Sequence, residues 1–374
     1  MRDIGRAMSS ILVSQSLRSL TESGAIRALI PFARDQIQPS SLDLRLGARV
    51  WQMQCSFLPG HQGIEKKIGR LSTAVWRADR DEPLVLHQGG VYLAELEEVL
   101  ELPAGIWGRT NPKSSTGRLD VFVRVLTEQG DAFDTIPEGY CGRLFLEITP
   151  QSFHIAVRRG DTLAQLRLAR GRPGLDAESL REWQASSPLC SWSDDSPAPV
   201  IDAMPPGVLL SVDLEEPIGV PVGYQARRHM PPIDLRHRDL PIERYWNTLY
   251  AHEDGHVLEP EQFYIFATRE RLRIPPDVCA ELVAFDATKG ELRTHYAGFI
   301  DSGFGWSGDD SSDLGSKLVL EIRTHDVPFL LEHGQPLFRV EFMRNEARPD
   351  VLYGRSGSHY QGQSLRLAKQ FRRA

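Results

Sequence analysis

The sequence predicts an all-β protein made of two tandem copies of one β-barrel or jelly-roll unit, with a few short helices. Three observations predict this class. Short runs rich in β-branched and aromatic residues are separated by Gly, Pro, Asp and Asn. The spacers are too short to hold a helix between successive strands. The order of the runs then repeats about 174 residues later along the 374-residue chain.

The first copy holds five expected strands between Gly90 and Leu168. They are four to eight residues long and rich in Val, Ile, Leu and Phe, as expected for strands that bury at least one face. Their sequences, in order, are VYLAEL, LDVFVRVL, GRLFLEI, FHIAV and LAQLRL.

The second copy repeats that order. FYIFATRERLRIPPDV parallels VYLAELEEVLELPAGI, LVLEI parallels LFLEI, and HGQPLFRVEF parallels RGDTLAQLRL. Glu147 corresponds to Glu321 and Gly160 to Gly334, both at an offset of 174 residues. Two copies of one unit are the simplest explanation of this register.

Helical periodicity is found mainly at two places, Ser10–Leu29 and Leu175–Ala185, and Asp176 is placed to cap the second segment. Between the copies the chain is rich in Ser and Pro, which suits an extended connector. We therefore expect a first unit at residues 1–172, a linker at 173–206 and a second unit at 207–374.

Composition excludes several classes of protein. The net charge is −7 and no basic stripe is present, so binding to nucleic acid or to an anionic membrane is not expected. The four cysteines form no C-x-x-C pair, which argues against a zinc knuckle or a thioredoxin-like motif. No run approaches 18 apolar residues and no signal peptide fits, so we expect a cytoplasmic protein with reduced thiols.

The segment Lys113–Arg118, KSSTGR, has the chemistry of a phosphate-binding loop. Its hydroxyls and backbone N–H groups can donate to phosphate oxygens, its glycine allows close approach, and its arginine offers a fork of donors. A polar turn between two strands is the alternative, because short motifs have low specificity.

Four motifs, taken in order along nearly the whole chain, resemble those of the dCTP deaminase family, which has the trimeric dUTPase-like β fold. The first looks like the family's QPASLDLRLG signature, the second like its RSSxGR nucleotide loop, the third like the strand that ends in its catalytic glutamate, and the fourth like its closing tail. In this chain they are IQPSSLDLRLG (37–47), KSSTGR (113–118), GYCGRLFLE (139–147) and YGRSGSHYQGQ (353–363). The resemblance implies two tandem dUTPase-like units.

The resemblance also implies an activity, the hydrolysis of dCTP to dUTP and ammonia at a cyclic amidine C–N bond, for pyrimidine deoxyribonucleotide synthesis. A glutamate would shuttle the proton without zinc, and the H-x-E and P-C-x-x-C signature of the zinc deaminases is absent from the sequence. Mg²⁺ would enter only with the triphosphate. Two alternatives stay open: a dUTPase or a bifunctional dCTP deaminase and dUTP diphosphatase, and a noncatalytic nucleotide-binding scaffold.

By the same resemblance each motif supplies residues to the site. Glu147 would be the proton shuttle, because one carboxyl group can both accept and donate the protons of a deamination. Ser114 and Arg118 would place water and phosphate. The remaining expected nucleotide-binding residues of the loop and of the tail are Lys113, Ser115, Thr116, Gly117, Tyr353, Tyr360 and Gln363. No metal ligand is expected.

The two copies depart from the family in complementary ways. In the second copy the loop reads ATKGE (287–291), where a glutamate replaces the arginine and would repel phosphate. Its segment HYAGFIDSGFG (295–305) resembles the family's pyrimidine-binding hairpin better than the first copy does, with Asp301 where the first copy has Pro137.

Two arrangements are compatible with these departures. In the first, KSSTGR of one copy faces Ala297, Asp301 and Glu321 of another, in a homo-oligomer with sites between units, and Glu321 is the shuttle. In the second, the first copies alone form complete sites with Glu147, and the second copy is a scaffold.

Three further positions carry expectations. His359 stands where the family tail has lysine, so nucleotide affinity is expected to weaken as pH rises past neutrality. Asp43 and Asp234 occupy parallel places in the two copies, and each is expected to pair with a nearby arginine as a structural residue. The insertion 306–315 in the second copy suggests no function.

Overall fold

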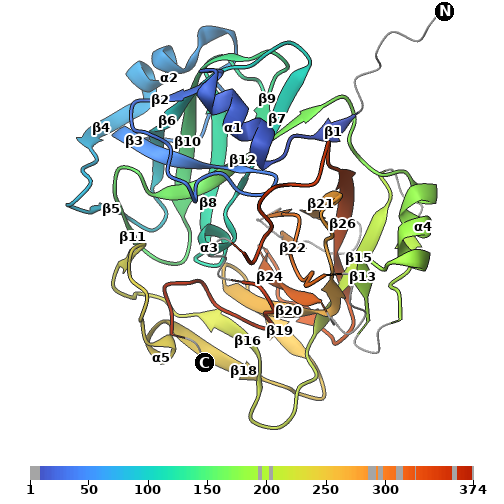
Figure 1. The fold of residues 1–374 in the computed structure, drawn as a ribbon. Coiled ribbons are helices and arrows are strands. Elements are labelled where there is room, and N and C mark those ends of the chain that lie inside the picture. The colour runs from blue at the N-terminus through green and yellow to red at the C-terminus, as the bar shows by residue number, and fades with distance from the viewer. Residues whose placement is uncertain are drawn as a thin grey trace, which may run out of the picture.

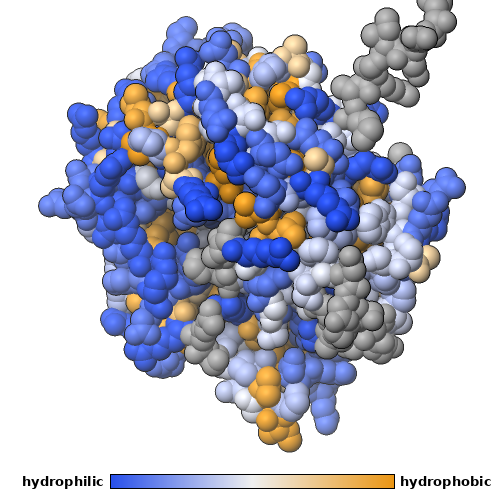
Figure 2. Space-filling model, in the orientation of Figure 1, coloured by the Kyte–Doolittle hydropathy of each residue, from blue (hydrophilic) through white to orange (hydrophobic). Residues whose placement is uncertain are grey.

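The computed structural model describes residues 9–192, 196–201, 205–284, 292–293, 298–308, 315–324, 326–355 and 360–372. Within them the chain is all-β with five short α-helices, which confirms the predicted fold class. In Figure 1 the first unit, blue to green, lies above the second unit, yellow to red. Figure 2 shows hydrophilic residues over most of one face, as expected when the strands bury their apolar side chains between the sheets.

The first unit is a curled antiparallel sheet of ten strands. Seven of them follow the order β8-β10-β6-β3-β12-β7-β9, and β1, β2 and β4 pair at its rim, while β5 and β11 form a small separate sheet with β17 of the second unit. The bounds are β1 (Ser10–Ile11), β2 (Ile26–Ala28), β3 (Leu42–Met53), β4 (Ser72–Arg77), β5 (Leu84–Leu86), β6 (Val91–Glu101), β7 (Ile106–Pro112), β8 (Val121–Thr127), β9 (Thr135–Ile136), β10 (Cys141–Pro150), β11 (Ile155–Val157) and β12 (Thr162–Arg170).

The second unit repeats this plan in a sheet of eleven strands, with the order β18-β16-β20-β15-β26-β21-β23 and with β24 beside β20. The bounds are β13 (Cys190–Ser191), β14 (Val200–Ile201), β15 (Gly207–Asp213), β16 (Pro221–Ala226), β17 (Ile233–Asp234), β18 (Trp246–Tyr250), β19 (His256–Leu258), β20 (Phe263–Leu272), β21 (Val278–Ala284), β22 (Leu292–Arg293), β23 (Gly298–Ile300), β24 (Ser316–Thr324), β25 (Phe329–Leu331) and β26 (Pro336–Arg344).

The pairing registers reproduce the sequence repeat. In the first unit β10 pairs with β6, and Glu147 lies opposite Leu93. In the second unit β24 pairs with β20, and Glu321 lies opposite Ile265. The two glutamates therefore occupy equivalent positions on equivalent strand pairs.

The helices are α1 (Ser14–Glu22), α2 (Ile64–Leu71), α3 (Ser114–Gly117), α4 (Ala177–Ser186) and α5 (Ile242–Tyr245). The first predicted helical segment contains α1 but is shorter than expected, because the chain turns at Gly24, whose φ is +80°, and enters β2. The predicted cap of α4 is present, since the Asp176 carboxylate accepts a hydrogen bond of 2.8 Å from the backbone N–H of Ser179.

The described part of the segment 173–206 packs on the second unit. Besides α4, it holds β13, which pairs with β20, and β14, which pairs with β15. Leu175, Leu180 and Leu189 are buried in the core of the second unit. These apolar side chains give the segment a packed face, so it is more than the extended connector that its proline and serine content suggests.

The two units share part of their core. Phe153 of the first unit meets Tyr245 and Trp246 of the second in edge-to-face contacts at 6.0 and 5.5 Å between ring centroids. Phe371, near the C-terminus, packs on the same two rings. Burying an aromatic side chain of this size stabilises the fold by roughly 1.5–3 kcal/mol.

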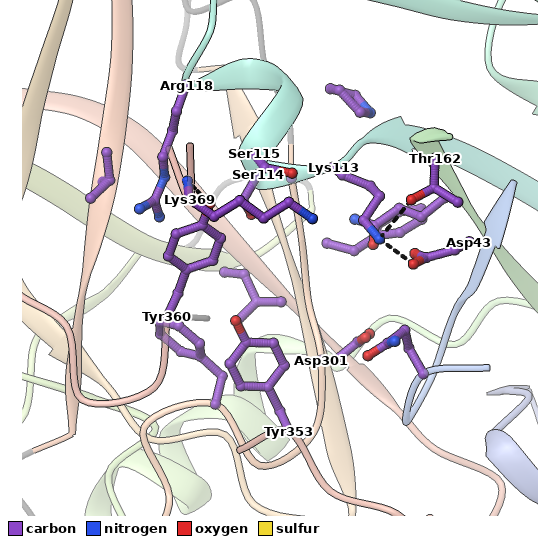
Figure 3. A pocket seen from close by; sticks show the side chains of 18 of the residues that line it. Asp43, Lys113, Ser114, Ser115, Arg118, Thr162, Asp301, Tyr353, Tyr360 and Lys369 are labelled. Atoms are coloured by element: carbon purple, nitrogen blue, oxygen red, sulfur yellow. Dashed lines mark hydrogen bonds and ion pairs between the residues drawn. The ribbon is translucent and has the colours of Figure 1, made fainter. Parts of the chain in front are cut away.

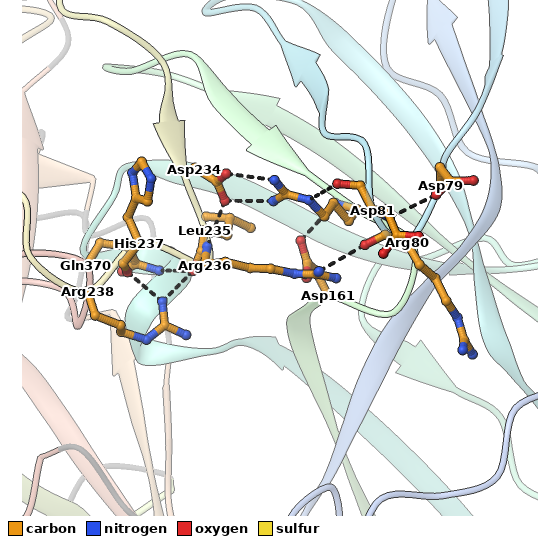
Figure 4. A network of polar contacts seen from close by, with 11 residues as sticks. Asp79, Arg80, Asp81, Asp161, Asp234, Leu235, Arg236, His237, Arg238 and Gln370 are labelled. Carbon is orange, nitrogen blue, oxygen red and sulfur yellow. Dashed lines mark hydrogen bonds and ion pairs between the residues drawn. The ribbon is translucent and has the colours of Figure 1, made fainter.

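A polar network joins the units beside this shared core (Figure 4). Strand β11 pairs in parallel with β17, and Asp234 at the end of β17 accepts two hydrogen bonds from Arg158, at 2.7 and 2.8 Å. Arg158 lowers the pKa of Asp234 to about 2. Arg236 reaches back to Asp161 at 3.3 Å. The expected pairing of Asp234 with an arginine is confirmed.

Candidate active site

A cavity of about 410 Å³ lies between the two units of the single chain. Its first-unit wall includes the KSSTGR segment and Asp43, and its second-unit wall includes Asp301, Glu321 and the C-terminal tail. Figure 3 shows the side chains of Asp43, Lys113, Arg118, Asp301, Tyr353 and Tyr360 around one space. The loop of the first copy therefore faces the hairpin and the glutamate of the second.

The KSSTGR segment forms α3, a single helical turn between β7 and β8. The backbone N–H groups of Thr116 and Gly117 donate to the carbonyl of Lys113 at 2.8 and 3.0 Å, which closes the turn. Lys113, Ser114, Ser115 and Arg118 line the cavity. Thr116 and Gly117 are buried within the turn and do not line it.

Lys113 is held by the first unit. Its amino group donates to the carboxylate of Asp43 and, at 3.3 Å, to the hydroxyl of Thr162. Burial raises the pKa of Asp43, and the ammonium of Lys113 opposes that rise. Asp43 thus differs from the expectation of a purely structural residue paired with arginine, because it pairs with lysine and lines the cavity.

Arg118 is almost fully buried by the tail. Its guanidinium lies 3.9 Å from the centroid of the Tyr360 ring, and its Nη1 donates to the carbonyl of Arg366 at 2.9 Å. Its Nε has no hydrogen-bond partner among the described residues. This group can still donate to a ligand.

Glu321 projects from β24 toward α3. A methyl group placed on Gly117 would clash with Oε2 of Glu321, so the carboxyl group can keep this position only beside glycine. Burial raises the pKa of Glu321 to about 8; Arg118 opposes the rise and the carboxylate of Asp120 adds to it. At neutral pH this side chain mostly carries its proton.

Glu147, the equivalent residue of the first unit, is placed differently. Its Oε1 accepts hydrogen bonds from Nη2 and Nε of Arg124, at 2.5 and 3.1 Å, across the β8–β10 pair. Glu147 is buried in this ion pair and is not among the residues that line the cavity. The structure therefore brings Glu321, and not Glu147, to the KSSTGR segment.

Asp301 joins the hairpin of the second unit to the first unit. Its two carboxylate oxygens accept hydrogen bonds from the hydroxyls of Ser40 and Ser41, at 2.6 and 3.0 Å. The guanidinium of Arg167 donates to it at 2.9 Å. Because these three donors occupy the carboxylate, Asp301 shapes the wall of the cavity and holds the SSLD segment in place. Ala297, His359 and the loop 287–291 lie outside the described residues.

The tail contributes three of the expected side chains to the cavity wall. Tyr353, Tyr360 and Gln363 all line it, as the resemblance implies. Gln363 Nε2 donates to the carbonyl of Lys317 at 3.2 Å, while its Oε1 has no partner among the described residues. Burial raises the pKa of both tyrosines, so their hydroxyls stay protonated.

Sequence reasoning missed two cations that line the cavity, namely Arg45, which pairs with Glu98, and Lys369. Lys369 lies six residues beyond Gln363, where the motif resemblance ends. Its signal in the sequence was weak, because a lone lysine near a chain end is usually a solvated surface residue.

The cavity is built for a polar ligand. Four residues that line it each have one buried polar atom without a hydrogen-bond partner among the described residues, namely Gln36 Oε1, Asp43 Oδ1, Arg118 Nε and Gln363 Oε1. Buried polar atoms are normally paired, but similar exceptions occur away from the cavity, at Trp246 and Asn345, so the charged side chains of the wall are the better sign of a polar ligand. Among all the described residues, no three His, Cys, Asp or Glu side chains gather as a metal site would need. None of the described helices is long and apolar enough to cross a membrane.

Known families and structures are similar to this chain over most of its length. Two family models match the chain in order. Residues 8–172 match the 2'-deoxycytidine 5'-triphosphate deaminase (DCD) N-terminal domain, and residues 176–371 match the C-terminal domain of the same family. A crystal structure of 2'-deoxycytidine 5'-triphosphate deaminase from Agrobacterium tumefaciens superposes with a TM-score of 0.84 and 36% identity, covering 91% of this chain and 99% of that one.

Curated relatives match a shorter part of the chain. The "dCTP deaminase, dUMP-forming" of Thermobifida fusca is 32% identical over 139 residues, which are 37% of this chain and 66% of that protein. The protein of the same description from a Parafrankia species is 34% identical over 142 residues, 37% of this chain and 65% of that protein. The chain thus spans about two thirds of the length of these relatives. With both domain models matched in order, the chain belongs to the dCTP deaminase family, in a form with two tandem domains.

Proposed function

We propose that this protein catalyses the hydrolytic deamination of dCTP to dUTP and ammonia, with Glu321 as the proton shuttle. One observation carries the proposal: a buried carboxyl group with a pKa of about 8 lies against the KSSTGR segment in a cavity with unpaired polar atoms. A carboxyl group with a pKa near the working pH both donates and accepts protons efficiently.

The protons balance through this one group. Protonated Glu321 donates to N3 of cytosine, and the resulting carboxylate removes a proton from the water that attacks C4. Glu321 then gives that proton to the amino group, which leaves as ammonia. The hydroxyl at C4 finally returns its proton to Glu321 as the carbonyl of uracil forms. One water is consumed and the enzyme is restored.

The triphosphate would lie along α3. The hydroxyls of Ser114 and Ser115 and the guanidinium of Arg118 supply donors that suit phosphate oxygens. Mg²⁺ would arrive bound to the phosphates, which are its usual ligands, and the proposed chemistry uses neither Mg²⁺ nor zinc. Tyr360 would hold Arg118 in place through its ring.

The proposal uses the composite arrangement, but within one chain. The loop comes from the first unit, and Asp301 and Glu321 come from the second. Glu147 then serves the fold through Arg124 and does no chemistry. Assembly into a homo-oligomer and residence in the cytoplasm stay predictions.

A second candidate function is deamination followed by loss of diphosphate in the same site. The observation that favours it is the description of the curated relatives as dUMP-forming. A noncatalytic scaffold is the third candidate, and it offers no reason for a buried carboxyl group beside α3.

Incubation of the full chain with dCTP and Mg²⁺, after treatment with a chelator, tests the three candidates. Ammonia and the nucleotide product are measured in the same sample. Ammonia with dUTP supports the proposal, ammonia with dUMP and diphosphate supports the bifunctional enzyme, and no turnover would support the scaffold.

Two matched variants test the glutamate assignment. Glu321→Gln should lower kcat by at least about 10²-fold, the lower end of the contribution of a general acid–base. Glu147→Gln should keep kcat near the wild-type value and lower only stability, because Arg124 loses its partner. Full activity of the Glu321→Gln enzyme would refute the assignment.

A further inference from the structure

Lys369 enters the cavity from a part of the chain that lies beyond the recognised tail motif. Figure 3 shows its side chain passing Ser114 toward Lys113. The side chain is half-buried, and no hydrogen bond or ion pair to its ammonium group is found among the described residues. An ammonium that has lost part of its hydration without gaining an acceptor is favoured by a nearby anion.

The charges around Lys369 do not supply that anion. Lys113 and Arg238 repel its ammonium, while Asp43 and Asp161 attract it less strongly. Asp43 already accepts from Lys113, and Asp161 accepts from Arg236. Burial, helped by the two cations, lowers the pKa of Lys369 to about 8.

The segment around Lys369 is fixed to the protein, so the backbone from which the side chain enters the cavity is held in position. Gln370 donates through Nε2 to the carbonyl of Leu235 at 3.0 Å, and Phe371 forms a parallel bridge with Leu240. The backbone N–H of Lys369 itself donates to the hydroxyl of Tyr360 at 3.2 Å.

The support beneath that segment is the polar network of Figure 4, which includes Gln370. Through Asp234 and Arg236 this network fastens the 233–238 segment to the first unit. Lys369 is therefore placed by contacts that exist without a ligand, and such preorganisation lowers the cost of binding.

We propose that Lys369 binds a phosphate oxygen of the nucleotide triphosphate and makes the site prefer triphosphates over nucleotides with fewer phosphates. The inference rests on the proposed function, and it adds a specificity-determining residue to that site. Lys113 shares its charge with Asp43, and Nη1 of Arg118 donates to a backbone carbonyl. Lys369 offers an ammonium without such a partner.

The test measures nucleotide binding without turnover. Calorimetry is carried out on the full chain carrying Glu321→Gln, alone and combined with Lys369→Gln, Lys369→Arg or Lys66→Gln. Lys66 is an exposed lysine of α2 and serves as the matched control for the loss of one positive charge. The ligands are dCTP, dCDP, dCMP and deoxycytidine, each at one salt concentration.

Lys369→Gln should raise the Kd of dCTP about 10–100-fold, the range for a hydrogen bond to a charged group. The effect should shrink from dCTP to dCMP and be absent for deoxycytidine, which has no phosphate. Lys369→Arg should restore most of the affinity, and Lys66→Gln should change nothing.

The pH dependence gives a second readout that a structural role would not move. With Lys369 present, the Kd of dCTP should rise between pH 7 and 9.5, because the ammonium is charged below its pKa of about 8 and neutral above it. The Lys369→Arg enzyme should show no such rise, since guanidinium stays charged. Glu321 cannot contribute, because glutamine replaces it in every variant.

Three results would overturn the inference. The first is an unchanged Kd of dCTP in the Lys369→Gln variant. The second is an equal loss of dCTP and deoxycytidine binding, which would show a structural role. The third is no dCTP binding by the Glu321→Gln enzyme with Lys369 intact, which would refute the proposed function and with it the inference.

Discussion

Replacing Gly117 with alanine tests whether the position of the Glu321 carboxyl group sets the reaction rate. The new methyl group would lie 2.2 Å from Oε2 of Glu321 and 2.7 Å from its Cδ. An ordinary contact begins at 3.4 Å, so the carboxyl group must move by about 1.2 Å. A misplacement of about 1 Å is enough to cost roughly 10²-fold in rate.

The fold should tolerate this change. Gly117 does not have a positive φ, it ends the helical turn α3, and alanine has a better helix propensity than glycine by about 1 kcal/mol. The expected result is therefore a kcat lower by about 100-fold with a melting temperature close to wild type. Gly174→Ala is the control, because a methyl group there meets nothing within 4 Å and its φ is not positive.

Steady-state release of ammonia, with thermal unfolding of the same preparations, is the assay. A second substitution, Glu321→Asp, makes the assay more specific because it shortens the side chain by one methylene. In the Gly117→Ala background it should lower kcat much less than in the wild type, since substitutions at neighbouring residues are not additive. Wild-type kcat in the Gly117→Ala enzyme, or full additivity of the two changes, would refute the reasoning.

Three further predictions concern stability and the phosphate wall. The pKa of Glu321 is about 8 in the folded protein against the ordinary value of 4.5, so its proton stabilises the fold at low pH and this effect is lost as pH rises through 8. Relative to wild type, the free energy of unfolding of Glu321→Gln should therefore increase by about 3–5 kcal/mol between pH 4 and 9. Denaturant titrations measure this, and a difference that does not change with pH would contradict it. Arg118→Lys keeps the charge but not the stacking on Tyr360, and kcat/KM for dCTP should fall about 10-fold or more; a change under twofold would count against the role of that contact. Asp234→Asn should lower the free energy of unfolding at pH 7 by about 1–2 kcal/mol, because the ion pair with Arg158 is lost. The difference from wild type should disappear as pH falls toward 2, because the ion pair contributes above the unfolded pKa of 3.8 and is lost as pH falls through the folded pKa. Calorimetric melts at both pH values check this.

The fold could be read from the sequence because its signals are local and repeated. Strand runs such as LFLEI and LVLEI occur twice in one order, and the structure places Glu147 and Glu321 in the same register of equivalent strand pairs. The Asp176 cap was also predictable, because its partner lies three residues away.

The choice between the two glutamates could not be read in this way. Both follow the same apolar run, and both are buried. They differ in the residue that lies beside the carboxyl group in the folded protein, which is Arg124 for Glu147 and Gly117 for Glu321. The second neighbour lies some 200 residues away in sequence, where no local pattern reaches.

Lys369 could not be predicted as a site residue for a related reason. Its environment is made by the 233–241 segment and by the hydroxyl of Tyr360, which the sequence does not link to it. The same holds for the segment 173–206, whose proline and serine content outweighed the leucines that pack it on the second unit.

The two units that line the cavity belong to one polypeptide, so the two sides of its wall are joined covalently. A site shared between separate chains is lost on dilution, whereas here the loop and Glu321 meet at a local concentration set by the length of the chain between them. Each copy can then change without damaging an identical partner, because a substitution in one glutamate strand is not repeated in the other. Such freedom would let the first copy use Glu147 for an ion pair with Arg124 while the carboxyl group of Glu321 in the second copy lies beside Gly117.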